Sequence, residues 1–163
     1  SMSSRIAVME KGKIVQEATP RELYLAPANA FVAEFLGNSN LIDGTIKERD
    51  GDNGCLVEAS FGYLRINAPV GVFSGAKVAI TIRPEHVRIH RDSAAMQKSF
   101  AARVESVSFL GEQSECQVLV NETALRCRVA SATSVVPGDE VWLEIPMEAC
   151  TLIADETGVP VNG

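Results

Sequence analysis

The chain has 163 residues, of which 46% are apolar, and a formal net charge of −6. This length allows one or two small domains with a real hydrophobic core. A groove that binds nucleic acid needs a positive surface, so the negative charge disfavours a nucleic-acid partner. We expect no membrane span, because no apolar run reaches the roughly 18 residues that a spanning helix needs. We also expect no secretion signal, because no charged-then-apolar leader occurs.

Residues 5–40 predict a β-hairpin followed by two short helices. The turn signal Lys11-Gly12 separates two apolar runs, which predicts a hairpin over Arg5–Gln16. Thr19, followed by Pro20 and by Glu22 three residues later, forms a capping box for a first helix. The second helix is predicted from an apolar stripe at helical spacing and a glycine that suits its C-cap: Phe31, Val32, Phe35, Leu36 and Gly37.

The order of these pieces resembles the end of the nucleotide-binding domain in ATP-binding subunits of bacterial ABC importers. The matching residues are Lys11–Ile14, Gln16, Thr19-Pro20, Glu22–Tyr24, Pro27, Phe31–Ala33 and Phe35–Gly37. Two positions depart from the family pattern, since Ala18 stands for a usual Gly and Ser4 for a usual Asp. The resemblance implies that residues 3–40 are the tail of that domain. It also implies a junction with the next domain, formed by Phe31, Phe35, Leu36, Gly37 and Asn40.

From Leu41 onward, apolar and polar residues alternate with period two, which predicts a mainly β region. The predicted strands are Leu41–Glu48, Gly54–Phe61, Tyr63–Ala68, Lys77–Ile89, Phe100–Phe109, Ser114–Val120, Thr123–Val129, Glu140–Ile145 and Cys150–Ile153. Two stretches, about 41–92 and 98–155, look alike. Gly75–Ile82 aligns with Gly138–Ile145, and Gly44–Glu48 aligns with Ala102–Ser106. This similarity predicts a duplicated unit that forms two small five-stranded barrels.

Three motifs in the β region carry a second resemblance, to the transport-associated OB domain of the same importer subunits. They are Asn40–Gly44, Ile82–His86 and Val107–Gly111. The resemblance implies a pair of OB-type β-barrels over residues 41–155, preceded by the hairpin and the short helices. The chain would then be the regulatory part of the subunit.

The sharpest local motif in the β region is Arg83-Pro84-Glu85. Pro84 cannot donate a ladder hydrogen bond, so it marks the end or the edge of a strand. Arg83 and Glu85 can then contact a second protomer or the other half of the β region. They can also form a surface ion pair that contributes less than about 1 kcal/mol. A second candidate interface lies at Leu110-Gly111, where an apolar strand ends at a glycine. Trp142 is expected to be partly exposed.

No motif in the sequence carries catalytic chemistry. It has neither a G-x-x-x-x-G-K-[ST] phosphate loop nor a G-x-S-x-G elbow, so we predict no enzyme activity and no cofactor for this chain. ATP and Mg²⁺ would bind elsewhere in the parent protein. His86 and His90, placed on one strand, would lie roughly 13 Å apart, which is too far for one metal. The four cysteines are read as small buried hydrophobes rather than as a metal or redox site: Cys55, Cys116, Cys127 and Cys150.

The sequence therefore predicts a regulatory and dimerisation part of an ABC-importer ATP-binding subunit. The cargo of the importer would be a polyamine (spermidine or putrescine), ferric iron or a sugar, and polyamine is the first choice. By resemblance, two subunits form a homodimer on two membrane permease subunits, at the cytoplasmic face of the cell membrane. One alternative is an OB domain that senses a small ligand and inhibits transport. Another is a nucleic-acid-binding OB protein, which the net charge disfavours.

Overall fold

The structure is a computed structural model that describes residues 6–10, 12–18, 39–51, 54–67, 73–92 and 98–154, with the single residues 22, 26, 28 and 32. The predicted hairpin is confirmed as β1 (Ile6–Glu10) paired antiparallel with β2 (Lys13–Ala18). The predicted helices lie mostly outside the described residues. In the region of the first predicted helix, the N–H of Ala26 donates to the carbonyl of Glu22 at 2.8 Å. Within the described part of the chain, no helix is long and apolar enough to cross a membrane.

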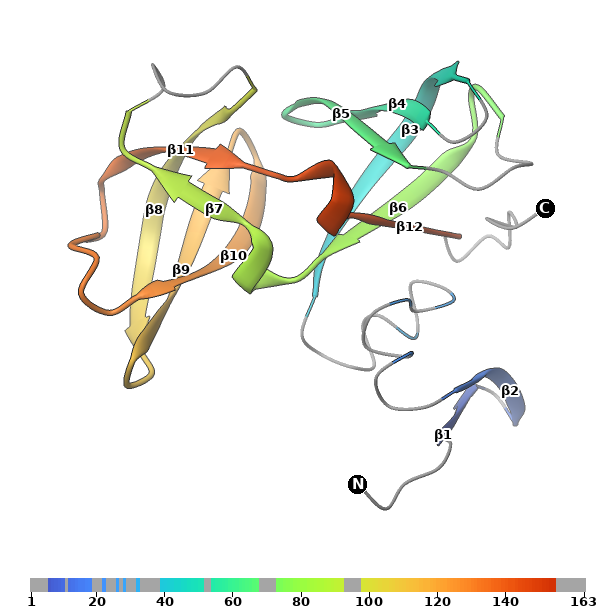
Figure 1. The fold of residues 1–163 in the computed structure, drawn as a ribbon, viewed down its shortest axis with the longest axis horizontal. Helices are drawn as coiled ribbons and strands as arrows, with labels where there is room; N and C mark the ends of the chain where they lie inside the picture. The colour runs from blue at the N-terminus through green and yellow to red at the C-terminus, as the bar shows by residue number, and fades with distance from the viewer. Residues whose placement is uncertain are drawn as a thin grey trace.

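The rest of the described chain forms two curled antiparallel sheets of five strands each (Figure 1). The first sheet has the order β12-β6-β3-β4-β5. Its strands are β3 (Asn40–Asp50), β4 (Gly54–Ala59), β5 (Gly62–Asn67), β6 (Lys77–Ile82) and β12 (Thr151–Ala154). The second sheet has the order β10-β9-β8-β11-β7. Its strands are β7 (Arg88–His90), β8 (Phe100–Phe109), β9 (Gln113–Val120), β10 (Thr123–Ala130) and β11 (Glu140–Glu144).

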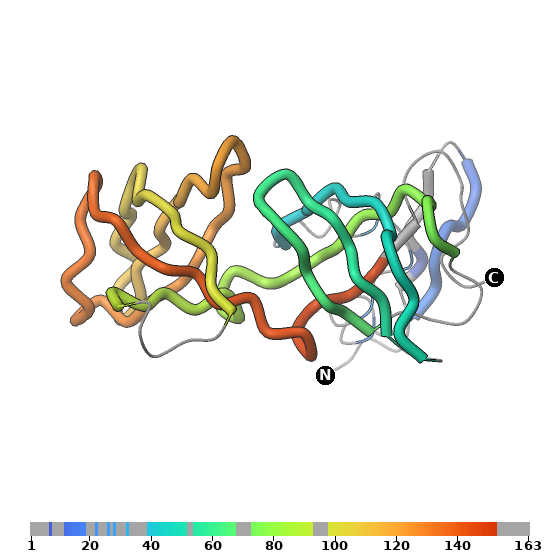
Figure 2. Tube along the Cα trace, turned by 90° about the horizontal axis from the view of Figure 1, so that it is seen from above, coloured from blue at the N-terminus to red at the C-terminus, as the bar shows by residue number. Residues whose placement is uncertain are grey.

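The two halves of the β region exchange their last strands. β7 follows β6 in the chain but pairs with β11 in the second sheet, and β12 follows β11 but pairs with β6 in the first. Figure 2 shows the result as two lobes joined by two crossing segments, one green and one red. Each crossing contains a short 3-10 helix, η1 (Pro84–His86) or η3 (Met147–Ala149). Neither sheet is complete without a strand from the other half.

Equivalent backbone bonds show how closely the halves match. In each half, one residue of the first long strand bonds to the two residues that lie just before the fourth strand. Ile46 bonds to Gly75 and Ala76 in the first half, and Val104 bonds to Gly138 and Asp139 in the second. The bonds are Ile46 N to Ala76 O (2.9 Å), Gly75 N to Ile46 O (2.7 Å), Val104 N to Asp139 O (2.9 Å) and Gly138 N to Val104 O (2.8 Å). A β-bulge follows each of these bonded residues, at Lys47 after Ile46 and at Glu105 after Val104. The alignment predicted from the sequence is confirmed at these positions.

Period-two alternation explains the strands and the core. Inward residues of both sheets are almost fully buried, as for Ile46 and Leu125, and they join one apolar cluster with residues of the other half. One predicted strand was wrong, because Lys77–Ile89 is broken between Ile82 and Arg88. Pro84 has no N–H for the ladder and its fixed φ suits the start of a helix, so the chain turns there and crosses to the other sheet.

Candidate functional site

The motif Arg83-Pro84-Glu85 lies at the crossing between the sheets. The side chains of Arg83 and Pro84 are buried, Arg83 to 6% exposure, and Glu85 is half-buried. The helix η1 packs against β10, and in the equivalent place η3 packs against β5. Each crossing helix therefore contacts an edge strand of the sheet to which the chain crosses. Of the two contacts considered from the sequence, this burial supports the one between halves of the same chain.

The histidines near this crossing do not share a strand face, which corrects the placement expected from the sequence. His86 ends η1 and is exposed, whereas His90 ends β7. His90 Nε2 lies 3.0 Å from Oε1 of Glu144 on the neighbouring strand. Among the described residues, no group of three or more His, Cys, Asp or Glu side chains is arranged to hold a metal ion.

The predicted domain junction is described at one of its five residues. Phe31, Phe35, Leu36 and Gly37 lie outside the described residues. Asn40 is buried to 6% exposure at the start of β3. Its side-chain amide bonds the backbone of Arg126 twice, donating to the carbonyl and accepting from the N–H, each at 2.8 Å. Nη2 of Arg126 donates in turn to the carbonyl of Ser39 at 3.3 Å. The entry point of the first sheet is thus bonded to an edge strand of the second.

Leu110 and Gly111 form the tip of the β8–β9 hairpin. Leu110 is 58% exposed and its neighbour Phe109 is 75% exposed. Gly111 has a φ of 93°, which a residue with a side chain rarely adopts. Ser131 braces the tip, because its hydroxyl donates to the carbonyl of Gly111 at 2.7 Å and its N–H to the carbonyl of Glu112 at 2.9 Å. The hairpin therefore presents two large apolar side chains on a well-bonded turn.

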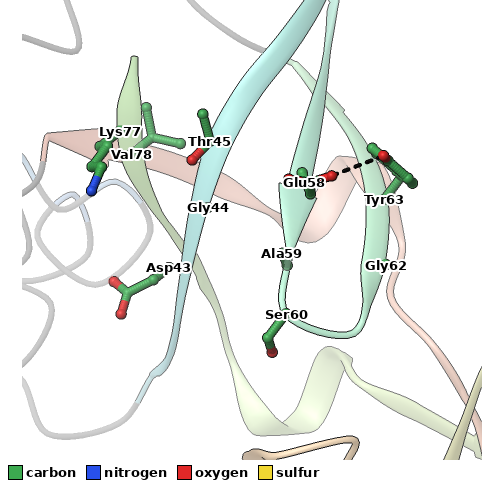
Figure 3. Close-up of a pocket in the computed structure, with 10 residues that line it drawn as sticks. All are labelled: Asp43, Gly44, Thr45, Glu58, Ala59, Ser60, Gly62, Tyr63, Lys77 and Val78. Carbon is green, nitrogen blue, oxygen red and sulfur yellow. Dashed lines mark hydrogen bonds between the residues drawn. The ribbon is translucent and has the colours of Figure 1, made fainter. Parts of the chain in front are cut away.

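A cavity of about 780 Å³ lies on the outward face of the first sheet (Figure 3). Side chains from four strands cross it as a ladder of directly paired residues, in the order Lys77, Thr45, Glu58 and Tyr63. The Tyr63 hydroxyl donates to Oε2 of Glu58 at 2.8 Å, and Lys47 Nζ lies 3.4 Å from the other carboxylate oxygen. The bond from Tyr63, with help from Lys47, lowers the pKa of Glu58 below its ordinary value. The same bond raises the pKa of Tyr63.

The second sheet has a smaller cavity, of about 400 Å³, in the equivalent place. Where the first cavity has Lys77, Thr45 and Glu58, the second has Glu140, Arg103 and Leu119 at the matching positions. The half-buried Trp142 also lines it, which agrees with the partial exposure predicted for this residue. The two cavities share their backbone frame but not their chemistry. Sequence reasoning missed both, since it did not compare the outward positions of the halves.

The cysteines lie where a reactive thiol is not expected. Cys55, Cys116 and Cys127 are buried, and Cys150 is partly buried. Burial raises the pKa of Cys127 and of Cys150 to about 12, and it also raises the pKa of Cys55 and Cys116. Because the thiolate is the nucleophile, these thiols are poor candidates for chemistry at neutral pH.

Comparison of the sequence with known proteins gives three findings. The family model of the TOBE domain matches residues 80–153. The spermidine/putrescine import ATP-binding protein PotA of Roseobacter denitrificans is 32% identical over 163 residues, which cover 95% of this chain and 44% of that protein. PotA 1 of Pseudomonas aeruginosa is 30% identical over 158 residues, covering 95% of this chain and 42% of that protein. The chain thus spans less than half the length of these relatives.

Among solved structures, the chain is similar to the cytoplasmic molybdate-binding protein ModG in a crystal form with molybdate bound. The TM-score is 0.64 at 14% sequence identity, and the match covers 71% of this chain and 95% of that one. At this identity the likeness concerns the fold alone.

Proposed function

We propose that this chain is the regulatory part of an ABC-importer ATP-binding subunit. Residues 80–153 match the family model of the TOBE domain, and most of the chain matches the C-terminal region of PotA-type ATP-binding proteins. Its role is to keep two such subunits associated while their ATP sites open and close. One observation carries the proposal: the similarity runs through 95% of the chain, so the N-terminal tail and the β region correspond to parts of one kind of subunit.

The proposal divides the chain into two parts. Residues 3–40 are the tail of a nucleotide-binding domain, and residues 41–155 are a regulatory domain made of two OB-type barrels. Asn40 is the residue where the two parts meet, and its bonds to Arg126 support this division. They tie the end of the tail to the second sheet as well as to the first, so a movement of the tail would carry both sheets with it.

The remaining features of the proposal belong to the whole subunit. ATP and Mg²⁺ bind the nucleotide-binding domain of the parent protein, and the subunit lies on the cytoplasmic face of the membrane through its permease partners. The cargo is a polyamine, as named for the relatives, and ferric iron or a sugar are the alternatives. Two subunits form a homodimer. Because Arg83 and Pro84 are buried inside this chain, Leu110 and Gly111 are the better candidates for the contact between subunits.

A transplant tests the proposal. Residues 6–154 of this chain replace the matching region of Pseudomonas aeruginosa PotA 1, in cells that lack their own PotA-type subunits. The expected result is uptake of labelled spermidine or putrescine well above that of cells with the region deleted. A chimera that assembles and hydrolyses ATP, but gives no more uptake than the deletion, would contradict the proposed role.

The first cavity favours a second candidate function, a small-ligand sensor that inhibits transport. Its volume of about 780 Å³ is enough for a small organic molecule, and it offers carboxylate, ammonium and hydroxyl groups. Calorimetry with the cargo and the isolated chain separates the two functions. Tight binding that is lost on Glu58→Gln, with no effect of the same change on association, would favour the sensor.

A further inference from the structure

In the described ranges of the chain, the outer edge of β8 has no partner strand beyond Val104. The strand β11 pairs with β8 only from Phe100 to Arg103, and the bonds of Val104 to Gly138 and Asp139 continue the contact by one residue. Among the described residues, no strand pairs with the outer side of β8 from Glu105 to Phe109, while β9 pairs with the inner side. Alternate N–H and C=O groups of this segment therefore point away from the sheet.

The first half provides an internal comparison for this edge. Within the part of the chain that the structure describes, β6 pairs with β3 only up to Thr45 and no other strand covers the outer edge of β3 at the matching place. There the sequence is Lys47-Glu48-Arg49-Asp50, which is charged at every position. On β8 the matching residues are Glu105-Ser106-Val107-Ser108, followed by Phe109. Charged side chains on an open edge prevent pairing with another strand, and an uncharged edge lacks this protection.

The only charged residue on the open edge of β8 already has a partner. Glu105 Oε1 lies 3.1 Å from Nη2 of Arg103 on the same strand. Ser106 and Ser108 are exposed and small, so a second strand can approach without meeting bulky or like-charged groups. At the end of the edge, Phe109 and Leu110 are 75% and 58% exposed on the turn that Ser131 braces. An edge of this kind suits a strand of the same composition.

We propose that the edge of β8 from Glu105 to Phe109 binds a second copy of this chain by antiparallel strand pairing across a two-fold axis near Val107. Antiparallel pairing of identical segments is self-complementary, as a two-fold dimer requires. With the axis at Val107, Ser106 of each copy lies opposite Ser108 of the other, and Glu105 lies opposite Phe109, so no like charges meet. Phe109 and Leu110 of each copy are then covered by the partner. This inference rests on the homodimer in the proposed function and gives that contact a definite place.

Sedimentation equilibrium of the full 163-residue chain tests the proposal. Ser106→Glu with Ser108→Asp gives β8 the charges that β3 carries at the matching positions and sets like charges opposite each other twice. This double variant is expected to raise the dissociation constant of the dimer about tenfold or more. Ser106→Lys with Ser108→Glu sets opposite charges across the same axis and is expected to dimerise at least as well as the unaltered chain.

The matched control is Ser74→Glu with Ser134→Asp, which makes the same change in charge at exposed loop positions and is expected to leave the dimer intact. Circular dichroism of each variant reports whether the sheets have formed. The proposal is wrong if the unaltered chain is a monomer up to millimolar concentration, or if the like-charge variant dimerises as well as the control. Either result leaves the importer assignment standing, since uptake by the chimeric subunit tests that separately.

Discussion

Asn40 is bonded through its side-chain amide to the backbone N–H and C=O of Arg126, which lies 86 positions later in the chain. The amide takes the place of a peptide group in a neighbouring strand, and it occupies a part of the β10 edge that would otherwise be open. One side chain thus joins the start of the first sheet to the edge of the second. This contact explains why an amide, with a donor and an acceptor on one carbon, suits the position.

Asn40→Asp should destabilise the chain by about 1–3 kcal/mol. The carboxylate can still accept from the N–H of Arg126, but it can no longer donate to the carbonyl, and two oxygens would face each other in a buried place. Urea unfolding followed by circular dichroism measures the change. Asn67→Asp, at an exposed position that ends β5, is the control and should change stability little. Equal stability of the two variants would show that the bonds to Arg126 contribute nothing.

Gly44→Ala should destabilise the chain by about 1–3 kcal/mol through overpacking. A Cβ at this position would clash with Cγ1 of Val57 and lie 3.1 Å from the carbonyl oxygen of Glu58. The matching residue in the second half is Ala102, which is buried at 8% exposure, so that sheet already holds a methyl group there. Ala102→Gly should therefore cost only about 1 kcal/mol. Thermal unfolding of both variants shows which one loses more stability. A larger loss of stability for Ala102→Gly than for Gly44→Ala would contradict the prediction.

Arg83→Ala should lower the free energy of unfolding by about 2–4 kcal/mol, because it truncates a side chain that is buried where η1 meets the second sheet and leaves a cavity there. The control is Arg88→Ala on β7, whose side chain is 60% exposed. Chemical unfolding measures both variants. If Arg83→Ala unfolded like the control but weakened association of the chain, Arg83 would serve a contact between protomers instead.

Tyr63→Phe should raise the pKa of Glu58, because the hydroxyl that donates to its carboxylate is removed. The lowered pKa means that this bond adds stability above the unfolded-state pKa of Glu58 and that the contribution is lost as the pH falls through the folded-state value. In the variant the loss should be smaller and should be complete at a higher pH, because the folded-state pKa lies closer to the unfolded-state value. A carbon NMR titration of the Glu58 carboxyl group measures the shift. An unchanged titration curve would show that the Tyr63 hydroxyl does not lower the pKa of Glu58. Lys47→Ala is the comparison and is expected to raise this pKa less.

Much of the fold follows from local patterns. Period-two alternation predicted the strands of the β region, because each strand buries one face. For β8 both ends of the strand were predicted correctly. The alignment of Gly75 with Gly138 also predicted the equivalent turns. The same patterns could not predict which strands pair. β7 and β12 read as the last strands of their own halves, and only the crossings at Pro84 and Met147 carry them into the other sheet.

The candidate site was less predictable for a similar reason. A charged residue beside a proline is usually exposed, but Arg83 is buried because the crossing chain folds back against β10. Asn40 was predicted at a junction, whereas its partner Arg126 could not be predicted because no local pattern links residues so far apart. Leu110 was predicted as a contact residue, and this stays a prediction; the structure shows that it is exposed at the hairpin tip. The open edge of β8 becomes visible only when the two halves are superposed strand by strand.

The two halves of the β region form one folding unit because they exchange strands. Native-state hydrogen exchange of the full chain in rising urea tests it most directly. The amides of β4 in the first sheet and of β9 in the second should exchange through the same global opening, with equal free energies and equal dependence on urea. The amides of β6 that pair with β12 should join that opening. Two separate openings, one for each sheet, would show that the halves are independent and would contradict the account.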